Sequence, residues 1–301
     1  MQLFVNDLTV IDFSYLCAER GMVGESWIVD IILDGSLNEQ SMVLDFGRVK
    51  KQIKRIIDDA VDHKLAVPAE HAYTRVTHHD DGNSYWVDFL RPNQRSIHLF
   101  CPADAFAFID AQAVTLESVT EYLRAVIKRE LPDNVQGLSL HLRPEAIPGA
   151  FYHYTHGLKK HDGNCQRIAH GHRSRLYVAL DGQRNEALEQ QWAQTWRDIY
   201  LGSTEDRVAH TVLQVSPILR QSERQSEIKI TAQSHVAYSY TADQGLFELL
   251  VPVAENYTIP TDSTVECIAD YLAQKIKQQH PQAAVKVTGF EGVGKGAIGY
   301  A

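Results

Sequence analysis

Apolar residues recur along the chain with two periods, one typical of strands and one typical of amphipathic helices. Residues 173–180 have the alternation and the β-branched and aromatic content of a strand. A spacing of three and four residues predicts one amphipathic helix in each half of the chain. The positions with this spacing are Phe46, Val49, Ile53, Ile56, Ile57 and Ala60, and then Leu188, Trp192, Trp196 and Ile199. We interpret the aromatic members of the second set as core residues.

The same order of elements occurs twice. Residues 115–123 match residues 264–272 position by position, and each segment opens a helix behind a threonine cap. The strand that follows ends in Glu145 in the first copy and in Glu291 in the second. A hairpin-like segment precedes each of these helices, at residues 85–100 and 235–251. We therefore predict strand, strand, helix, hairpin insertion, helix, strand and strand, in two tandem copies.

The length and composition fit two globular domains. The 301 residues are enough for two cores, and 44% hydrophobic with 22% charged residues is typical of a soluble globular protein. The repeat places the boundary near Gly149, so we expect domains at residues 1–148 and 149–301. The net charge of -9 and the lack of a basic stripe argue against nucleic acid as a partner.

The sequence also predicts a cytoplasmic protein without a membrane anchor. The N-terminal residues include acids but no basic cluster, and no apolar run approaches the length that crosses a bilayer. The cysteines lie far apart without a CxxC pair, which indicates reduced thiols. They are Cys17, Cys101, Cys165 and Cys267. For all but Cys165 we expect small buried hydrophobic residues.

Candidate chemistry gathers in residues 156–172. His170 and His172 stand two positions apart at the start of a predicted strand, so both rings project from one face. His156 ends the preceding strand-like segment, and the intervening loop can fold it beside that pair. Three neutral imidazoles leave one tetrahedral position open, as in catalytic zinc sites. The alternative is a surface feature, because 14 histidines make chance proximity easy.

Each copy resembles the T-fold domain of the tetrahydrobiopterin synthases. This group contains 6-pyruvoyltetrahydropterin synthase and the bacterial 6-carboxytetrahydropterin synthase of queuosine biosynthesis. The family motifs are a histidine before leucine at a strand end, a cysteine ahead of His-Gly-His, a Gly-Met-Val-x-Asp-Phe-like segment at the first helix, an Asp-His pair after that helix, a Thr-x-Glu box and a late glutamate. The resemblance covers nearly the whole chain, but its motifs are divided between the copies.

The losses in the two copies are complementary. The second copy has the three histidines, Cys165 and Glu291, but shows Asp206-Arg207 where the family has Asp-His. The first copy has the motif at residues 41–46, the pair Asp62-His63 and Glu145. At the zinc-ligand positions our alignment gives the first copy Ser14, Val23 and Glu25. In the family the Asp-His pair reaches the zinc site across a domain interface, so the resemblance implies one complete site per chain.

The resemblance also implies a fold and an assembly. The fold is of the α+β class, with two tandem T-fold domains, each an antiparallel sheet with two helices on one face plus an inserted hairpin. Such domains close into β-barrel homo-oligomers, which removes exposed sheet edges. We expect the domain at 1–148 to supply the Asp-His pair and the domain at 149–301 to hold the zinc.

The implied function is that of a zinc-dependent lyase acting on a small-molecule pterin, 7,8-dihydroneopterin triphosphate, by carbon–oxygen or carbon–carbon cleavage. The implied roles are Zn²⁺ binding by His156, His170 and His172, general base catalysis by Cys165, a proton relay by Asp62 and His63, and pterin binding by Glu291. Glu145 is either vestigial or binds a pterin in a zinc-free pocket. From the residues alone, Asp62-His63 could equally cap a helix, and Cys165 could point away from the site.

Two other functions stay open at this stage. One is a non-catalytic pterin- or purine-binding protein that keeps the fold and the glutamates. The other is a T-fold enzyme with a changed substrate, since the two hairpin insertions leave room for different chemistry. The basic residues considered for a triphosphate are Lys159, Lys160, Arg167, Arg173 and Lys295.

Overall fold

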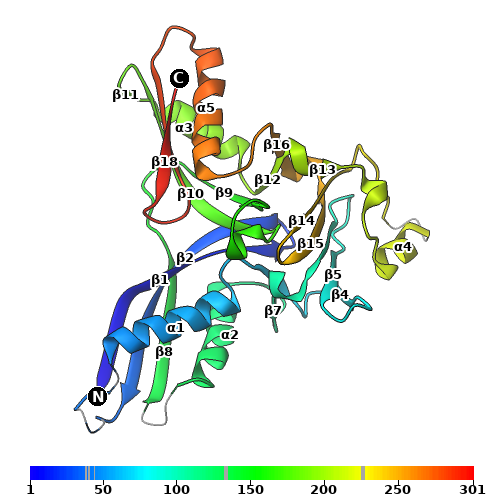
Figure 1. The fold of residues 1–301 in the computed structure, drawn as a ribbon. Coiled ribbons are helices and arrows are strands. Elements are labelled where there is room, and N and C mark those ends of the chain that lie inside the picture. The colour runs from blue at the N-terminus through cyan, green and yellow to red at the C-terminus, as the bar shows by residue number, and fades with distance from the viewer. Residues whose placement is uncertain (38, 40, 44, 132–134, 225–227) are drawn as a thin grey trace.

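The described residues form three β-sheets (Figure 1). Helices cover two of them, and the third contains strands from both halves of the chain. The structure is a computed structural model that describes all residues except 38, 40, 44, 132–134 and 225–227. Leu44 of the family motif at 41–46 therefore lies outside the described residues. No described helix has the length and apolar content needed to cross a membrane.

The first sheet is built on a long hairpin. Its strand order is β7 (Phe106–Ile109), β3 (Leu65–Pro68), β1 (Gln2–Cys17), β2 (Gly21–Gly35) and β8 (Val135–Pro144). The helices α1 (Phe46–Ala60) and α2 (Leu116–Lys128) pack against one face. The buried side of α1 includes Ile53, Ile56, Ile57 and Ala60, as the spacing predicts. Thr115 caps α2 by accepting the backbone N–H of Ser118, as predicted from the repeat.

The second sheet has the same plan. Its order is β16 (Asn256–Ile259), β12 (Ile199–Ser203), β9 (Phe151–His156), β10 (His170–Leu180), β17 (Val285–Phe290) and β18 (Gly296–Tyr300), with β11 (Gln183–Arg184) beside β10. Its helices are α3 (Glu186–Thr195) and α5 (Val265–Gln279). Thr264 caps α5 as Thr115 caps α2. The aromatic residues of α3 and its end, Trp192 and Trp196, are buried in this core as predicted.

The third sheet differs from the expectation of one separate hairpin in each copy. Its order is β13 (Arg207–Val208), β14 (His235–Ala242), β15 (Gly245–Pro252), β6 (Ile97–Pro102), β5 (Ser84–Phe89) and β4 (Thr74–His78). Strand β15 of the second half pairs antiparallel with β6 of the first, so both insertions form one continuous sheet. The physical reason is that each insertion offers an unpaired edge that the other can satisfy.

Short helical segments complete the chain. The helix α4 (Pro217–Arg224) lies in the insertion of the second half. The 3₁₀ turns are η1 (Ala103–Ala105), η2 (Gly163–Gln166), η3 (Thr204–Asp206), η4 (His210–Val212) and η5 (Val253–Glu255). Of these, η2 matters for function because it carries Cys165.

The two halves face each other about an approximate two-fold axis. Leu99 of β6 lies opposite Leu249 of β15, and these two residues hold the same place in their own halves. Near the centre of the molecule, where β2 lies against β9 and β10, Gly24 meets Gly171. A Cβ on Gly171 would lie 2.7 Å from the Cα of Gly24, so only glycine permits this approach. The fold is thus α+β with two tandem T-fold-like halves, which confirms the predicted class.

Candidate metal centre and active site

Three buried imidazoles meet at the end of the β9–β10 hairpin. His170 pairs directly with His156 in the antiparallel register, and His172 follows two residues along the same face of β10. One nitrogen of each ring lies within 4.8 Å of the others. All three side chains are almost wholly buried. The structure therefore brings together the three residues that the sequence singled out as ligands.

The chain engages Nδ1 of His156 and of His170 through hydrogen bonds, and Nδ1 of His172 faces a carboxylate. The Nδ1 atom of His156 lies 3.0 Å from the carbonyl oxygen of Ser263, and that of His170 lies 2.9 Å from the carbonyl oxygen of Arg167. The Nε2 atoms of His156 and His172 are buried without a hydrogen-bond partner among the described residues. Nδ1 of His172 makes no hydrogen bond there either, although it lies 3.2 Å from Oδ1 of Asp12. Burial and neighbouring histidines hold the pKa of His156 and of His170 well below the ordinary value. Neutral rings with a fixed Nδ1 and a free Nε2 are what a metal such as Zn²⁺ requires.

The Asp62-His63 pair lies against this group although it belongs to the first half. It occupies the turn between α1 and β3, where His63 has a left-handed φ of 53°. The ring centroid of His63 lies 5.0 Å from that of His170. Nδ1 of His63 is 2.7 Å from Oδ2 of Asp62, which fixes the ring. The pair thus faces the imidazoles across the boundary between the halves.

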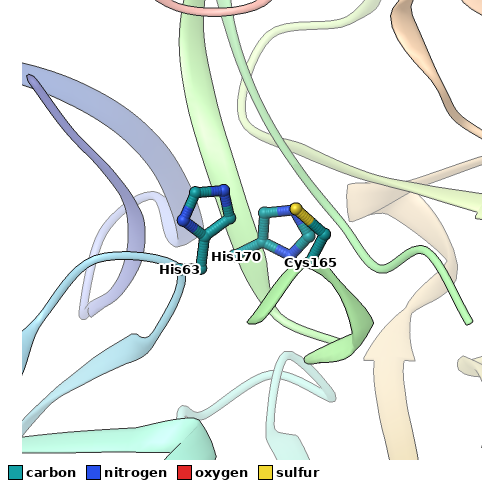
Figure 2. Close-up of side chains that lie close together, drawn as sticks. All are labelled: His63, Cys165 and His170. Atoms are coloured by element: carbon teal, nitrogen blue, oxygen red, sulfur yellow. The ribbon is translucent and has the colours of Figure 1, made fainter. Parts of the chain in front are cut away.

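Cys165 lies beside His63 and His170 (Figure 2). Ligand atoms of these three residues lie within 4.8 Å of one another, so they form a second group that could hold a metal. The all-imidazole group is the better ligand set, because its three side chains are fully buried and each Nδ1 faces an oxygen of the chain. Burial disfavours the charged form of His63, but hydrogen bonds to Asp62 and Cys165 outweigh it and raise the pKa of His63 to about 10. His63 therefore holds its proton near neutral pH, beside the Cys165 sulfur.

Glu291 lies at the edge of the metal group. Its Oε1 is 3.9 Å from Nε2 of His172, and its Oε2 is 3.5 Å from Nζ of Lys295. About a fifth of this side chain is exposed, at 21%. A partly open carboxylate next to the imidazoles can accept hydrogen bonds from a bound molecule.

Comparison with known proteins decides the family. The sequence profile described as 6-pyruvoyl tetrahydropterin synthase matches residues 18–146 and again residues 149–294. The chain belongs to this family. It carries the family's domain twice, which confirms the tandem arrangement predicted from the repeat.

Solved structures of 6-pyruvoyl tetrahydropterin synthases are similar to part of the chain. A 6-pyruvoyl tetrahydropterin synthase from Plasmodium vivax is 14% identical, with a TM-score of 0.36, and the match covers 48% of this chain and 97% of that one. The enzyme from Plasmodium falciparum is 12% identical with a TM-score of 0.37 and the same coverage. No curated protein matches the sequence.

The strand register corrects our alignment of the family's ligand positions in the first half. Tyr15 pairs with Val23 as His156 pairs with His170, so Tyr15 and not Ser14 stands in the place of His156. Ser14 instead corresponds to Thr155, and the two hydroxyl oxygens lie 2.7 Å apart across the two-fold axis. A loose sequence match cannot fix such a register to one residue, because one step turns every side chain to the other face.

A second correction concerns the Asp-His position of the second half. Leu65 pairs with Ser14 as Tyr200 pairs with Thr155, so the counterpart of His63 is Asp198. Both residues have a left-handed φ, of 53° and 55°. The segment Asp206-Arg207, which our alignment placed there, lies further along the chain. Asp206 contacts Lys159 instead, at 2.6 Å.

The counterpart position in the first half is closed by its own ion pair. Arg20 donates to both carboxylate oxygens of Asp198, from Nε at 3.0 Å and from Nη2 at 2.5 Å, and Nη1 of Arg20 reaches the hydroxyl of Tyr15. Glu25, in the place of His172, lies 3.7 Å from His153. Among the described residues, both groups that could hold a metal lie in the second half's site or at its border.

Glu145 lies apart from the imidazoles. Its Oε1 is 2.7 Å from Nη2 of Arg175, and its carbonyl oxygen accepts a hydrogen bond from Arg173. The pairing of β2 with β8 also puts Pro144, not Glu145, at the level of Glu291. The carboxylate is thus already paired with a guanidinium, and the two glutamates are not equivalent by register.

The basic residues considered for a phosphate group separate into two sets. Lys159 and Lys160 form ion pairs with Glu205 and its acidic neighbours, and Arg173 stacks over Phe151 at 4.1 Å. Arg167 and Lys295 lie at the site itself. Arg167 donates to the carbonyl oxygen of Asp62 at 3.4 Å, and Lys295 contacts Glu291.

Asp12 and Ser263 are site residues that the sequence analysis missed. Asp12 lies 3.2 Å from Nδ1 of His172, although 160 positions separate it from that residue in the printed sequence. Ser263 holds His156 through its carbonyl and its hydroxyl oxygen, each at 3.0 Å. Both contacts depend on how the two halves and the loop before α5 pack. Neither contact follows from a local pattern.

Proposed function

We propose that this protein is a zinc-dependent lyase that acts on a pterin, with 7,8-dihydroneopterin triphosphate as the substrate to test first. Membership of the 6-pyruvoyl tetrahydropterin synthase family supports a pterin synthase-like activity. The observation that carries the proposal is the meeting of Asp62-His63 from the first half with Cys165, His170 and their neighbours from the second. Decay of an unused site would not be expected to keep these groups in contact.

Three imidazoles would hold the zinc ion, through the Nε2 atoms of His156, His170 and His172. A zinc ion held there would supply Lewis acidity toward the oxygens of a bound pterin side chain. The burial of the rings, the lowered pKa of His156 and of His170, and the unpartnered Nε2 atoms of His156 and His172 fit this ion.

Cys165 and His63 would move the proton. The thiol of Cys165 transfers its proton to His63, and the resulting thiolate accepts a proton from the substrate carbon. The raised pKa of His63, to about 10, favours the state in which the imidazole holds the proton. Asp62 keeps Nδ1 of His63 protonated and so directs Nε2 toward the thiol.

Glu291 would bind the pterin ring and Arg167 or Lys295 the phosphate groups. A carboxylate accepts two hydrogen bonds from an amino group and an adjacent ring N–H, which specifies this type of heterocycle. Glu291 has an exposed side, and Lys295 lies 3.5 Å from it. Glu145 is not part of this proposal, because Arg175 already pairs with its carboxylate.

The first experiment replaces His63. His63→Gln should reduce turnover of 7,8-dihydroneopterin triphosphate by about 100-fold or more, because general acid–base groups contribute 10²–10⁴-fold. Zinc content should stay unchanged, since His63 is outside the imidazole group. Product identity is read by mass spectrometry and zinc by elemental analysis.

Asp198→Asn is the matched control, because Asp198 holds the same place in the other half. It should leave turnover within about threefold of the unchanged protein. Full activity of His63→Gln would contradict the shared site. Pterin binding without any product from the unchanged protein would indicate a binding protein in place of an enzyme.

The protein is also proposed to be a cytoplasmic homo-oligomer. Strands β8 and β18 end their sheets, and each leaves one row of backbone hydrogen-bonding groups unpaired among the described residues. Such edges favour pairing with another chain. Light scattering at two concentrations would give the molecular mass, and a mass of 33.9 kDa at both would contradict the oligomer.

A further inference from the structure

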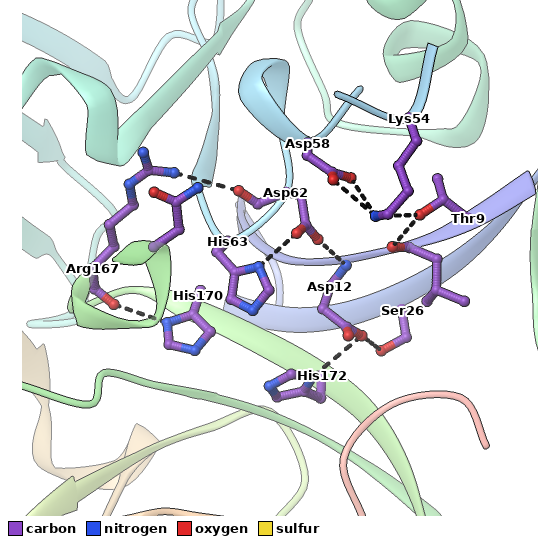
Figure 3. Close-up of polar contacts among 12 residues, drawn as sticks. Thr9, Asp12, Ser26, Lys54, Asp58, Asp62, His63, Arg167, His170 and His172 are labelled. Carbon is purple, nitrogen blue, oxygen red and sulfur yellow. Dashed lines mark hydrogen bonds and ion pairs between the residues drawn. The ribbon is translucent and has the colours of Figure 1, made fainter. Parts of the chain in front are cut away.

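One buried carboxylate links the two parts of the site (Figure 3). Asp12 lies in β1 of the first half and is 4% exposed. Its Oδ1 is 3.2 Å from Nδ1 of His172 and accepts a hydrogen bond from the hydroxyl of Ser26 at 2.5 Å. Its Oδ2 is 3.3 Å from Nζ of Lys295. The carboxylate is thus held from two sides and directed at one of the three imidazoles.

The backbone of the same residue holds the Asp62-His63 pair. The N–H of Asp12 donates to Oδ1 of Asp62 at 2.8 Å. The carbonyl oxygen of Asp12 accepts the N–H of His63 at 2.7 Å. Asp12 therefore contacts both parts of the site. Its side chain faces His172, and its main chain binds the Asp62-His63 pair.

The partner of His172 differs from those of the other two imidazoles. His156 and His170 each face a carbonyl oxygen from their own half, at Ser263 and Arg167. His172 faces a carboxylate, and that carboxylate comes from the other half. A carboxylate at Nδ1 fixes the tautomer, turns Nε2 toward the ion and makes the ring a stronger donor.

We propose that Asp12 is a positioning residue for the metal centre, which it controls from the half that supplies no ligand. The inference rests on the proposed function, because it concerns the same three histidines. Asp12 accepts the Nδ1 proton of His172 and orients its Nε2 lone pair, while its main chain sets the distance to His63. The second half alone would then keep three histidines but bind the ion more weakly.

The chain offers a matched control at the same place in the other half. By strand register the counterpart of Asp12 is His153, whose Nδ1 lies 2.8 Å from the carbonyl oxygen of Gly24 and 3.7 Å from Glu25. His153 is 8% exposed and lies in β9, three residues before His156. A change there alters the same interface without removing a contact to a proposed ligand.

The test measures Zn²⁺ affinity of the full chain by competition with a chromophoric chelator, without substrate. D12A should bind Zn²⁺ about 10- to 100-fold more weakly, the usual effect of losing such a partner. D12N should lose about threefold or more, because an amide still accepts a hydrogen bond but carries no charge. His153→Asn should bind as the unchanged protein does. Absorption of the Co²⁺ complexes should change for both Asp12 variants and not for the control.

The outcomes separate the two proposals. Unchanged affinity and an unchanged Co²⁺ spectrum in D12A would overturn the role of Asp12 while leaving the zinc site intact. An equal loss in His153→Asn would also overturn it, because the effect would then come from the interface in general. Failure of the unchanged protein to bind Zn²⁺ would contradict the proposed function itself. Circular dichroism of the metal-free variants checks their folding. If D12A does not fold, the Zn²⁺ affinity of D12N tests the role of Asp12.

Discussion

At the scale of single residues, Glu25 of the counterpart position should make the free energy of unfolding depend on pH. Glu25 is buried between the halves, and burial raises its pKa to about 7. Because the folded-state pKa lies above the ordinary value of 4.5, the folded chain holds this proton more tightly than the unfolded chain does. The contribution of this proton to the free energy of unfolding is fully present below about pH 4.5 and is lost as pH rises through 7.

Replacing Glu25 should therefore flatten this part of the stability profile. Between pH 5 and pH 8 the unchanged protein should lose up to about 3 kcal/mol more unfolding free energy than Glu25→Gln. Urea unfolding at both pH values measures the difference. Glu121→Gln, at an exposed side chain of α2, should show the unchanged profile. Parallel profiles for Glu25→Gln and the unchanged protein would refute the assignment.

Residues close in sequence were predictable, and residues close only in space were not. The imidazole pair His170 and His172 follows from the two-residue period of a strand. Asp12 could not be found this way, because its contact with His172 forms only when β1 packs against the second half. The counterpart of His63 was wrongly placed at Asp206-Arg207, because only the pairing of β12 with β9 fixes Asp198 there.

At the scale of elements, the close approach of β2 and β10 makes one glycine critical. A Cβ on Gly171 would lie 2.3 Å from the carbonyl oxygen of Tyr154 and 2.5 Å from Oγ of Ser14. Backbone atoms cannot turn aside as a flexible side chain can. The strands must separate to admit even one methyl group.

Gly171→Ala should consequently cost about 1–3 kcal/mol or more of unfolding free energy. It should also weaken zinc binding, because Gly171 lies between the proposed ligands His170 and His172. Thermal unfolding and chelator competition measure the two effects. Gly289→Ala is the control, since its Cβ would meet Ala269 at an ordinary 3.6 Å. Equal stability of both variants would contradict the close approach.

The sequence predicts the elements within each half better than it predicts the third sheet. The helices and their threonine caps follow from local periodicity and from the repeat. The parallel strands β3 and β7 were not predicted, and Ile199, which the spacing places on a helix, begins β12. The shared third sheet does not follow from local periodicity, because its central pairing of β6 with β15 joins segments about 150 residues apart. No local sequence pattern predicts which strand edge a hairpin will pair with.

At the scale of the whole molecule, the arrangement predicts one metal ion per chain. The second half supplies three imidazoles, whereas the counterpart position has Tyr15, Val23 and Glu25 and an ion pair from Arg20 to Asp198. Elemental analysis after dialysis should give about one zinc per chain. His172→Ala should lower this below about 0.2, because two neutral imidazoles bind zinc poorly. Two zinc ions per chain would show that the counterpart position also binds metal.

The pairing of Leu99 with Leu249 on the two-fold axis has a consequence for how the protein can vary. In a symmetric pair of identical chains, every substitution appears at both sites and must be tolerated twice. Here the related surfaces are parts of one chain, so each substitution appears once. The counterpart position around Tyr15 and Glu25 can accordingly change, or be redesigned, without altering any residue of the metal centre on the other side of the axis.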